Sequence, residues 1–382
     1  MTPAAGSTND PAGGATAPRR RVLVIFGGRS AEHEVSVISA RSVLEALDPG
    51  RFDVITVGID KAGRWHRVAA LPAAPTGAGP LPSVGADSGP GVALAREPGD
   101  RAIVADDGTR TDVDVVFPIL HGPYGEDGTI QGMLELAGVP YVGAGVLASA
   151  IGMDKAVQKT LFAAAGLPVV PHEVVWDREW EEDREAVEAR AEALGLPVFV
   201  KPAALGSSVG ISKVRQLDQF SAAMEEALSY GTKAIVERGV EGAREIECAV
   251  FGNDDPVASL PGEILPAAGA DFYDYRAKYL DDSTRLQVPA DLPDEVVGRI
   301  QGLAVAAFRA VDAAGMARVD FFHVPPDEVI VNEINTIPGF TPVSMYPKMW
   351  ESSGLPYAEL VERLIDLAVE RHEKERKRGR GL

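Results

Sequence analysis

The pattern of apolar positions near the start of the chain predicts a strand, a helix and a second strand. VLVIFGG (22–28) and FDVITVGID (52–60) are apolar runs of the kind found in buried parallel strands. Between them, HEVSVISARSVLEAL (33–47) places its apolar residues at helical spacing. We therefore expect a βαβ unit and an α/β domain with an open parallel sheet.

This first domain is expected to span residues 21–145 and to contain an interruption. Residues 69–98 are rich in Pro, Gly and Ala, and we interpret them as an irregular insertion without a core of its own. The sheet resumes with the apolar run 113–120, a helix through QGMLELAG and the strand VPYVG. Residues 1–20, rich in small and polar residues, cannot bury a core and are predicted to be a disordered tail.

A different pattern begins after residue 145. Residues 146–235 are predicted to form a central mixed α+β module, because a loop of small residues joins two of its strands directly and makes them an antiparallel pair. Its expected elements are a helix over 153–165, a strand at 169–175, a charged helix over 178–194, a strand at 197–202 and a helix at 217–231.

Residues 236–382 are predicted to form a third, C-terminal domain. Its expected elements are strands at 234–240, 244–252, 257–265, 317–324 and 328–335, a loop over 268–285, a helix near 293–312 and a C-terminal helix.

Composition and charge narrow the possible partners. The 382 residues, 46% of them hydrophobic, are enough for two or three globular domains. A net charge of −19, from 37 basic and 56 acidic residues, leaves no basic surface for nucleic acid. Any phosphate site must therefore be local, and the expected partners are small molecules.

Targeting signals and cysteine usage indicate the compartment. The apolar run after Arg19, Arg20 and Arg21 is too short for an export signal, and no stretch approaches the roughly 20 apolar residues of a membrane span. The single cysteine, Cys248, lies in IECAVFG, where we expect an inert core thiol. These features favour a cytoplasmic protein.

The segment KPAALGSSVGISKV (201–214) has two interpretations. Gly206 to Gly210 fit G-x-S-x-G, the turn that presents a nucleophilic serine in hydrolases, but that turn must lead into a helix and a strand follows here. Alternatively, the glycines and serines form a hairpin whose backbone N–H groups close over an anion, while Lys201 supplies a charge.

Acidic and amide side chains near two C-terminal strands indicate a metal site. Alternation places Glu333 and Asn335 on one face, and Asp320 is expected at the end of a neighbouring strand. Such oxygen ligands suit Mg²⁺ that also binds substrate phosphates, although they could instead be solvated polar residues. With Lys201 and Lys155 they suggest a magnesium nucleotide site without a G-x-x-x-x-G-K-[ST] loop.

A dinucleotide site is the main rival interpretation. Residues 143–148 match G-x-G-x-x-A and follow a predicted strand, and Glu173 lies further on. The match falls at the end of a sheet domain, whereas the fingerprint normally opens one, so a tight turn between domains explains the glycines more simply.

Three further segments are candidate parts of a site. Glu32 follows the first strand, where open α/β domains hold ligands, and it could bind an ammonium group or simply stabilise a helix start. His121 begins a loop of breaker residues at an equivalent position. The aromatic segment 271–279 could be a lid or an ordinary surface loop.

At this point the motifs resemble a known family. HGPYGEDGTIQGMLELAGVPYVGAGVLASAIGMDK, KPAALGSSVGISKV, FYDYRAKY and RVDFFHV followed by VNEINTIPGFTPVSMYP are similar, in order and distance, to D-alanine–D-alanine ligases of the ATP-grasp superfamily. The resemblance covers nearly the whole chain from Arg21. It implies an ATP-grasp fold and ATP-dependent joining of two D-alanines for peptidoglycan synthesis, and its relatives suggest a homodimer.

The resemblance also implies site residues. The resemblance assigns catalytic roles to Glu32, Ser207, Lys278, Tyr279, Arg318 and Gly339. For substrate it implies Glu32, His121, Tyr273 and Ser344. The nucleotide would contact Lys155, Lys201, Ser207, Ser208, Glu237, Val240, Glu245, Lys278, Asn332 and Glu333. Two Mg²⁺ (or Mn²⁺) ions would bind Asp320, Glu333 and Asn335.

The implied chemistry proceeds through a D-alanyl phosphate, which the amine of the second D-alanine attacks. Arg318 and the Gly339 N–H resemble the donors that a tetrahedral oxyanion needs. Tyr279 would link the lid to Ser207 and Glu32, and its presence resembles the relatives that make a dipeptide rather than D-alanyl-D-lactate. The remaining alternatives are a dehydrogenase, a serine hydrolase and a nucleotide-binding regulator without turnover.

Overall fold

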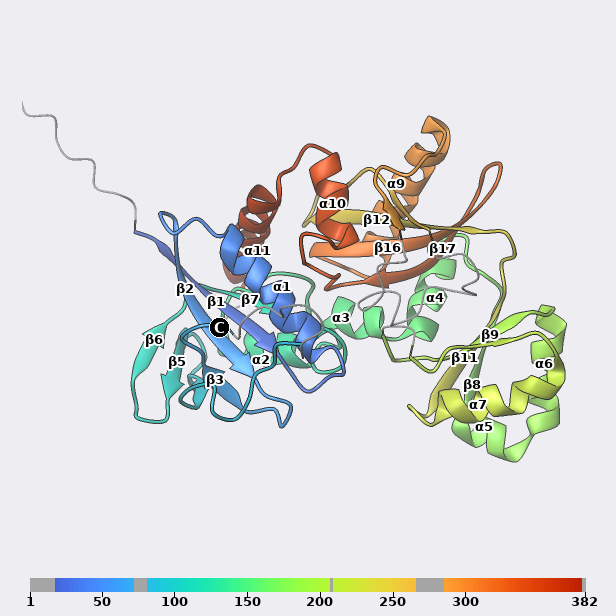
Figure 1. The fold of residues 1–382 in the computed structure, drawn as a ribbon, viewed down its shortest axis with the longest axis horizontal. Coiled ribbons are helices and arrows are strands. Elements are labelled where there is room, and N and C mark those ends of the chain that lie inside the picture. The colour runs from blue at the N-terminus through green and yellow to red at the C-terminus, as the bar shows by residue number, and fades with distance from the viewer. Residues whose placement is uncertain (1–17, 72–80, 207–208, 266–284, 380–382) are drawn as a thin grey trace, which may run out of the picture.

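The computed structural model describes residues 18–71, 81–206, 209–265 and 285–379 (Figure 1). Its first sheet has the order β3-β2-β1-β7. The strands are β1 (Arg20–Gly27), β2 (Phe52–Ile59), β3 (Trp65–Arg67) and β7 (Val115–Ile119). Both neighbours of β1 pair with it in parallel, and helix α1 (His33–Ala46) connects β1 to β2. The predicted βαβ unit is therefore confirmed.

The expected irregular insertion is partly wrong. Strands β4 (Val92–Leu94), β5 (Ala102–Ala105) and β6 (Arg110–Asp112) form a small antiparallel sheet, and Val92 packs in one buried cluster with Leu23 of β1. A three-residue strand among prolines and glycines is too short to show alternation, which is why its sequence reads as irregular. Helix α2 (Thr129–Ala137) follows, and the expected strand VPYVG forms only an isolated bridge from Tyr141 to Val116.

The central module contains an antiparallel sheet of order β10-β9-β11-β8. Its strands are β8 (His172–Trp176), β9 (Val198–Pro202), β10 (Ser212–Val214) and β11 (Lys233–Arg238). The expected antiparallel pair on either side of the small-residue loop is β9 and β10. Helices α5 (Asp177–Glu182), α6 (Arg184–Leu194) and α7 (Phe220–Leu228, preceded by the 3-10 turn Leu217–Gln219) pack beside this sheet (Figure 1).

The predicted charged helix 178–194 is two helices. Asp183 leaves the helical conformation and its side chain accepts a hydrogen bond from the Ala186 N–H, so it caps α6. Two short helices, α3 (Val146–Met153) and α4 (Lys155–Ala164), precede the strands of this module. Asp154 ends α3 and caps α4 by accepting from Ala156 and Val157. The expected helix over 153–165 corresponds to α4.

The third sheet has the order β15-β14-β12-β16-β17, with β13 beside β12. Its strands are β12 (Arg244–Gly252), β13 (Val257–Ala258), β14 (Gly262–Leu265), β15 (Arg285–Gln287), β16 (Gly315–Val324) and β17 (Glu328–Asn335). Helix α9 (Asp294–Ala310) packs against it. The expected strand 257–265 is interrupted at Pro261, which cannot donate to a ladder.

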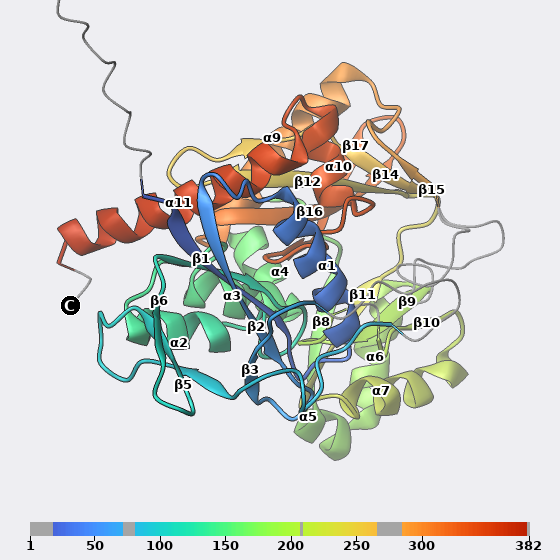
Figure 2. The same ribbon diagram turned by 60° about the vertical axis from the view of Figure 1, so that its left-hand side comes forward.

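The C-terminal helix is also divided in two, α10 (Met345–Ser352) and α11 (Tyr357–Lys377). Gly354, with φ of +88°, and Pro356 separate them. These helices share one buried cluster with the first sheet, in which Phe26 and Phe117 join Tyr346 and Leu364. Figure 2 shows α11 alongside α1, so the first and last helices of the described residues are packed together.

In the described part of the chain, every helix is too short or too polar to cross a bilayer.

Cys248 lies at the centre of the third sheet. It is fully buried, and burial raises the pKa of its thiol to about 12. We expect no reaction of the native protein with a thiol-specific dye at pH 8 and one equivalent of reaction in denaturant, because only the thiolate is reactive. Rapid labelling of the native protein would contradict this burial.

Candidate active site

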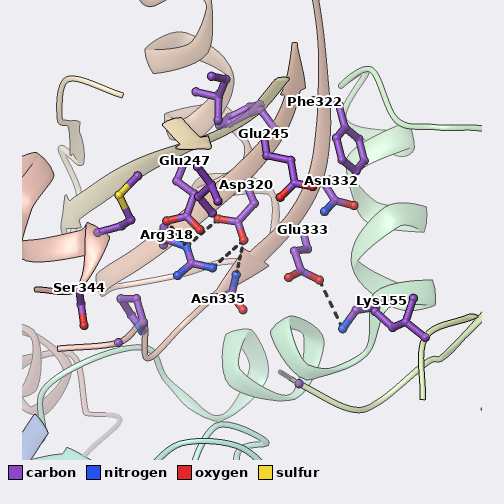
Figure 3. A pocket seen from close by; sticks show the side chains of 18 of the residues that line it. Lys155, Glu245, Glu247, Arg318, Asp320, Phe322, Asn332, Glu333, Asn335 and Ser344 are labelled. Carbon is purple, nitrogen blue, oxygen red and sulfur yellow. Dashed lines mark hydrogen bonds and ion pairs between the residues drawn. The ribbon is translucent and has the colours of Figure 1, made fainter. Parts of the chain in front are cut away.

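A cavity of about 870 Å³ lies where the first sheet, the central module and the third sheet meet. The loops after β1 and β7, strands β9 and β11, strands β12, β16 and β17, and the segment 337–345 all contribute side chains to it. Figure 3 shows its central part, in which carboxylates from β12, β16 and β17 point toward basic side chains. The cavity brings together every described residue of the predicted site, namely Glu32, His121, Lys155, Lys201, Glu237, Val240, Glu245, Arg318, Asp320, Asn332, Glu333, Asn335, Gly339 and Ser344.

The predicted oxygen ligands lie on adjacent strands. Asp320 is directly opposite Glu333, and Arg318 is directly opposite Asn335, in the antiparallel pair β16–β17. Directly opposed residues project to the same side of a sheet, so all four side chains face the cavity. Asp320 was expected at a strand end, but it lies in the middle of β16, and the convergence comes from cross-strand pairing.

A β-bulge explains why two consecutive residues of β17 line the cavity. The register shifts after Asp320, so Phe321 pairs with Val331 and Asn332 is the extra residue. A bulge turns the extra side chain out of simple alternation. Asn332 and Glu333 therefore both reach the cavity, and the Glu333 carboxylate lies 3.4 Å from the Lys155 ammonium (Figure 3).

Arg318 is surrounded by acids. Its Nε and Nη2 both donate to the Asp320 carboxylate at 2.7 Å, and Nε lies 3.2 Å from Glu247. Burial disfavours its charge, but Asp320 and Glu247 more than offset this and raise the pKa of Arg318 further above its ordinary value. Glu247 was not among the predicted site residues. It lies opposite Asp320 on β12, a pairing that only the folded sheet reveals.

The opposite wall holds a buried cluster of one acid and two lysines. Glu237 accepts a hydrogen bond of 2.7 Å from Lys201, and its other oxygen lies 3.2 Å from Lys159. Burial alone would favour the neutral acid, but the two lysines lower the pKa of Glu237 to about 2. For Lys159, burial outweighs Glu237 and lowers the pKa of the amine. Sequence reasoning missed Lys159, which occupies a helix position that looks like an ordinary surface site.

The end of the cavity near the first sheet contains a second charged group. His121 is buried, with Nδ1 3.2 Å from the Ile337 carbonyl and 3.5 Å from Glu126. Burial lowers and Glu126 raises the pKa of His121, with a net rise, while burial and the nearby Glu32 raise that of Glu126. Ser30 accepts from the Glu32 N–H and donates to the His121 carbonyl, which joins the two loops.

The segment after β17 closes the same end. Ser344 precedes α10, and its hydroxyl accepts from the Thr341 N–H at 3.1 Å. Gly339 packs so closely that a Cβ there would lie 3.1 Å from the Ser344 oxygen. Both residues were predicted site residues, and the turn places them next to each other.

The acidic residues fit a divalent cation that binds together with a nucleotide. Among the described residues, no three His, Cys, Asp or Glu side chains are grouped to hold a metal by themselves. Asp320, Glu333 and Asn335 instead offer two carboxylates and one amide oxygen. Mg²⁺ commonly takes one or two carboxylates and completes its shell with water and substrate phosphates, so this donor set suits it.

Five predicted site residues lie outside the described residues: Ser207, Ser208, Tyr273, Lys278 and Tyr279. The same holds for most of the predicted loop 268–285.

The described flanks of Ser207 still test the hydrolase interpretation. After Gly210 the chain enters β10, which pairs antiparallel with β9. A nucleophile turn requires a helix there, so this interpretation is wrong.

The dinucleotide interpretation is also unsupported. Gly145 precedes α3, but no strand precedes it, since Tyr141 forms only an isolated bridge. None of residues 143–148 is among the described residues that line the cavity. Gly143 instead contacts Gly315, where a Cβ would lie 2.9 Å from the Gly143 Cα. Gly143 therefore allows a close backbone contact between the segment before α3 and the start of β16.

Comparison with known proteins identifies the family. Residues 21–144 match the family profile described as D-ala D-ala ligase N-terminus, and residues 161–366 match that of the D-ala D-ala ligase C-terminus. A D-alanine–D-alanine ligase from Pseudarthrobacter chlorophenolicus is 52% identical over 379 residues, covering 96% of this chain and 97% of the relative.

Two solved structures are similar along nearly their whole length. The D-alanine–D-alanine ligase from Coxiella burnetii has a TM-score of 0.82 at 39% identity, covering 95% of this chain and 98% of that one. The VanG D-Ala:D-Ser ligase from Enterococcus faecalis has a TM-score of 0.80 at 35% identity, covering 92% of this chain and 100% of that one. The fold is therefore the ATP-grasp fold that was expected, and this chain belongs to the D-alanine–D-alanine ligase family.

Proposed function

We propose that this protein joins two D-alanine molecules, with ATP hydrolysed to ADP and phosphate, through a D-alanyl phosphate intermediate. The observation that carries the proposal is the single cavity in which Lys155, Lys201 and Arg318 face the acids Asp320 and Glu333. A carboxylate is a poor electrophile, and transfer of a phosphoryl group to it requires charge neutralisation around the phosphate. The lysines and the oxygen ligands meet this requirement.

The nucleotide would lie between β9, β11 and β17. Lys155 and Lys201 would contact its phosphates. The buried carboxylate of Glu237 would accept a hydrogen bond from the base, the backbone near Val240 would also contact the base, and Glu245 would bind the ribose. Asn332 lies on the bulge beside these groups. The ionised state of Glu237 supports its role as an acceptor.

Two divalent cations, Mg²⁺ or Mn²⁺, would be held by Asp320, Glu333 and Asn335. Bound there, they would neutralise charge on the phosphoryl group that is transferred. In the structure Asp320 accepts hydrogen bonds from Arg318 and Asn335.

The amino acids would occupy the end of the cavity near the first sheet. Glu32 would bind the ammonium group of the first D-alanine, with His121 beside it, and Ser344 would bind the carboxylate of the second. When the second amine attacks, the oxyanion would accept hydrogen bonds from Arg318 and the Gly339 N–H. Ser207, Ser208, Tyr273, Lys278 and Tyr279 complete the proposed set. We also propose a cytoplasmic homodimer.

The deciding experiment measures phosphate release from ATP and Mg²⁺ with single amino acids. We expect release with D-alanine together with D-alanyl-D-alanine, and at most weak activity with L-alanine. D-serine and D-lactate are tested beside D-alanine as second substrates, because the Enterococcus relative is named a D-Ala:D-Ser ligase. ATP binding without product under any of these conditions would support a regulator, and NADH binding without phosphate release would support a dehydrogenase.

A further inference from the structure

One face of α4 is directed at the outer edge of β17. Gln158 and Lys159 lie about one turn after Lys155 on this helix, and the three residues contact successive parts of the strand. Lys155 reaches the Glu333 side chain at 3.4 Å. Gln158 Oε1 accepts from the Ile334 N–H at 2.9 Å, and Lys159 Nζ donates to the Asn332 carbonyl at 2.8 Å.

The strand needs these partners because β17 is the last strand of its sheet. The outward backbone groups of an edge strand have no ladder partner, and buried groups of this kind must be satisfied elsewhere. The Val331 N–H is satisfied by the Pro168 carbonyl. After Val331 the bulge changes the pairing of β17. There the Asn332 carbonyl accepts a hydrogen bond from Lys159, and the Ile334 N–H donates one to Gln158.

The side chains of Gln158 and Lys159 each make a second contact, away from β17. Gln158 and Lys159 are each about 1% exposed. The Gln158 amide also donates to the Gly152 carbonyl at 2.8 Å, and Lys159 lies 3.2 Å from Glu237 on β11. Neither contact can shift without leaving a buried polar group without a partner, which makes the arrangement rigid.

We propose that Gln158 and Lys159 are positioning residues that bracket Glu333 and hold the bulge so that Asn332 and Glu333 face the nucleotide. Gln158 fixes the backbone on one side of Glu333, and Lys159 fixes it on the other. Lys159 also sets the separation between this strand and Glu237 of β11. The catalytic part of this inference rests on the proposed function, whereas the structural part does not.

The structural part is tested in the protein without nucleotide or metal. We expect Gln158→Leu to speed amide hydrogen exchange in the segment 332–335 by about fivefold, the effect of losing one ordinary hydrogen bond. Val157→Ala, which changes an exposed position of the same helix, is the matched control and should leave this segment unchanged. Equal exchange in both variants would overturn the inference.

The catalytic part is tested by steady-state kinetics at varied Mg²⁺ concentration. In Gln158→Leu and Lys159→Met we expect the Mg²⁺ concentration for half-maximal rate to rise roughly 10- to 100-fold, as is typical when a residue that orients a metal ligand is lost. The KM for D-alanine should stay unchanged. A merely structural role would instead lower the melting temperature with a normal Mg²⁺ requirement, which would overturn the inference.

One further variant guards against misfolding. Lys159→Arg keeps a donor for the Asn332 carbonyl, so its Mg²⁺ concentration for half-maximal rate should be close to that of the wild type. If it instead matches Lys159→Met while remaining folded, the inference fails. If the wild type makes no dipeptide, the proposed function fails and the exchange experiment alone decides this inference.

Discussion

Replacing Arg318 by methionine is expected to impair both stability and turnover. The change leaves the buried carboxylates of Asp320 and Glu247 without their shared cation, and breaking a buried ion pair in this way typically costs about 3–5 kcal/mol. If Arg318 also donates to the oxyanion, turnover should fall by roughly 10²- to 10³-fold. Urea unfolding and kcat, measured on the same preparation, check the two effects.

Two control variants separate these effects. Arg318→Lys keeps a charge beside the acids but loses the two parallel hydrogen bonds, so it should recover part of the stability and little of the rate. Arg299→Met removes an exposed arginine whose nearest carboxylate, that of Asp327, is 4.0 Å away, and it should change stability by less than about 1 kcal/mol. Normal stability of Arg318→Met would contradict the buried-pair description.

Glu333→Gln is expected to lose metal-dependent turnover while remaining folded. The side chain is 20% exposed and lies 3.4 Å from the Lys155 ammonium in the cavity, so its neutralisation leaves the core intact. A ligand contribution of about 3 kcal/mol corresponds to a loss of roughly 10²-fold in kcat, with a higher Mg²⁺ requirement. Rates at several Mg²⁺ concentrations and a thermal melt measure both properties.

The same strand offers a matched control for Glu333. Glu328 begins β17 and is exposed, so Glu328→Gln makes the identical chemical change away from the cavity. It should leave the rate and the Mg²⁺ requirement unchanged. Wild-type kinetics in Glu333→Gln would refute the assignment of Glu333 as a metal ligand, whatever the behaviour of the control.

The sequence predicted those features that depend on local periodicity. The βαβ unit around α1 and the antiparallel pair β9–β10 follow from apolar spacing and from the length of the connecting loop. The short strand β4 was missed because a three-residue strand is decided by tertiary packing. The helix break at Asp183 was missed although its cap is a local hydrogen bond, because Asp183 stands in a run of charged residues that reads as one helix. Element order was thus predictable, whereas several boundaries were not.

Some residues of the candidate site could likewise be predicted from the sequence, and others could not. The sequence could predict that Asp320, Glu333 and Asn335 lie together, because their residue types and strand alternation suggested a common site; their role as metal ligands stays a prediction. Glu247 and Lys159 could not, because their roles come from partners distant in sequence, Arg318 and Glu237 respectively. The roles that rest on family resemblance, including those of Ser207 and Tyr279, stay predictions, as do the domain boundaries.

The core shared by the first sheet and the last two helices has a consequence for biosynthesis. Phe26 and Phe117 are covered partly by Tyr346 and Leu364, residues that the ribosome adds long after the first sheet. Until then the opening sheet must expose an apolar face that aggregates easily. The central sheet buries its own cluster around Trp180 and Phe220, so it can fold first on the nascent chain, whereas the first sheet must wait until α10 and α11 have been synthesised.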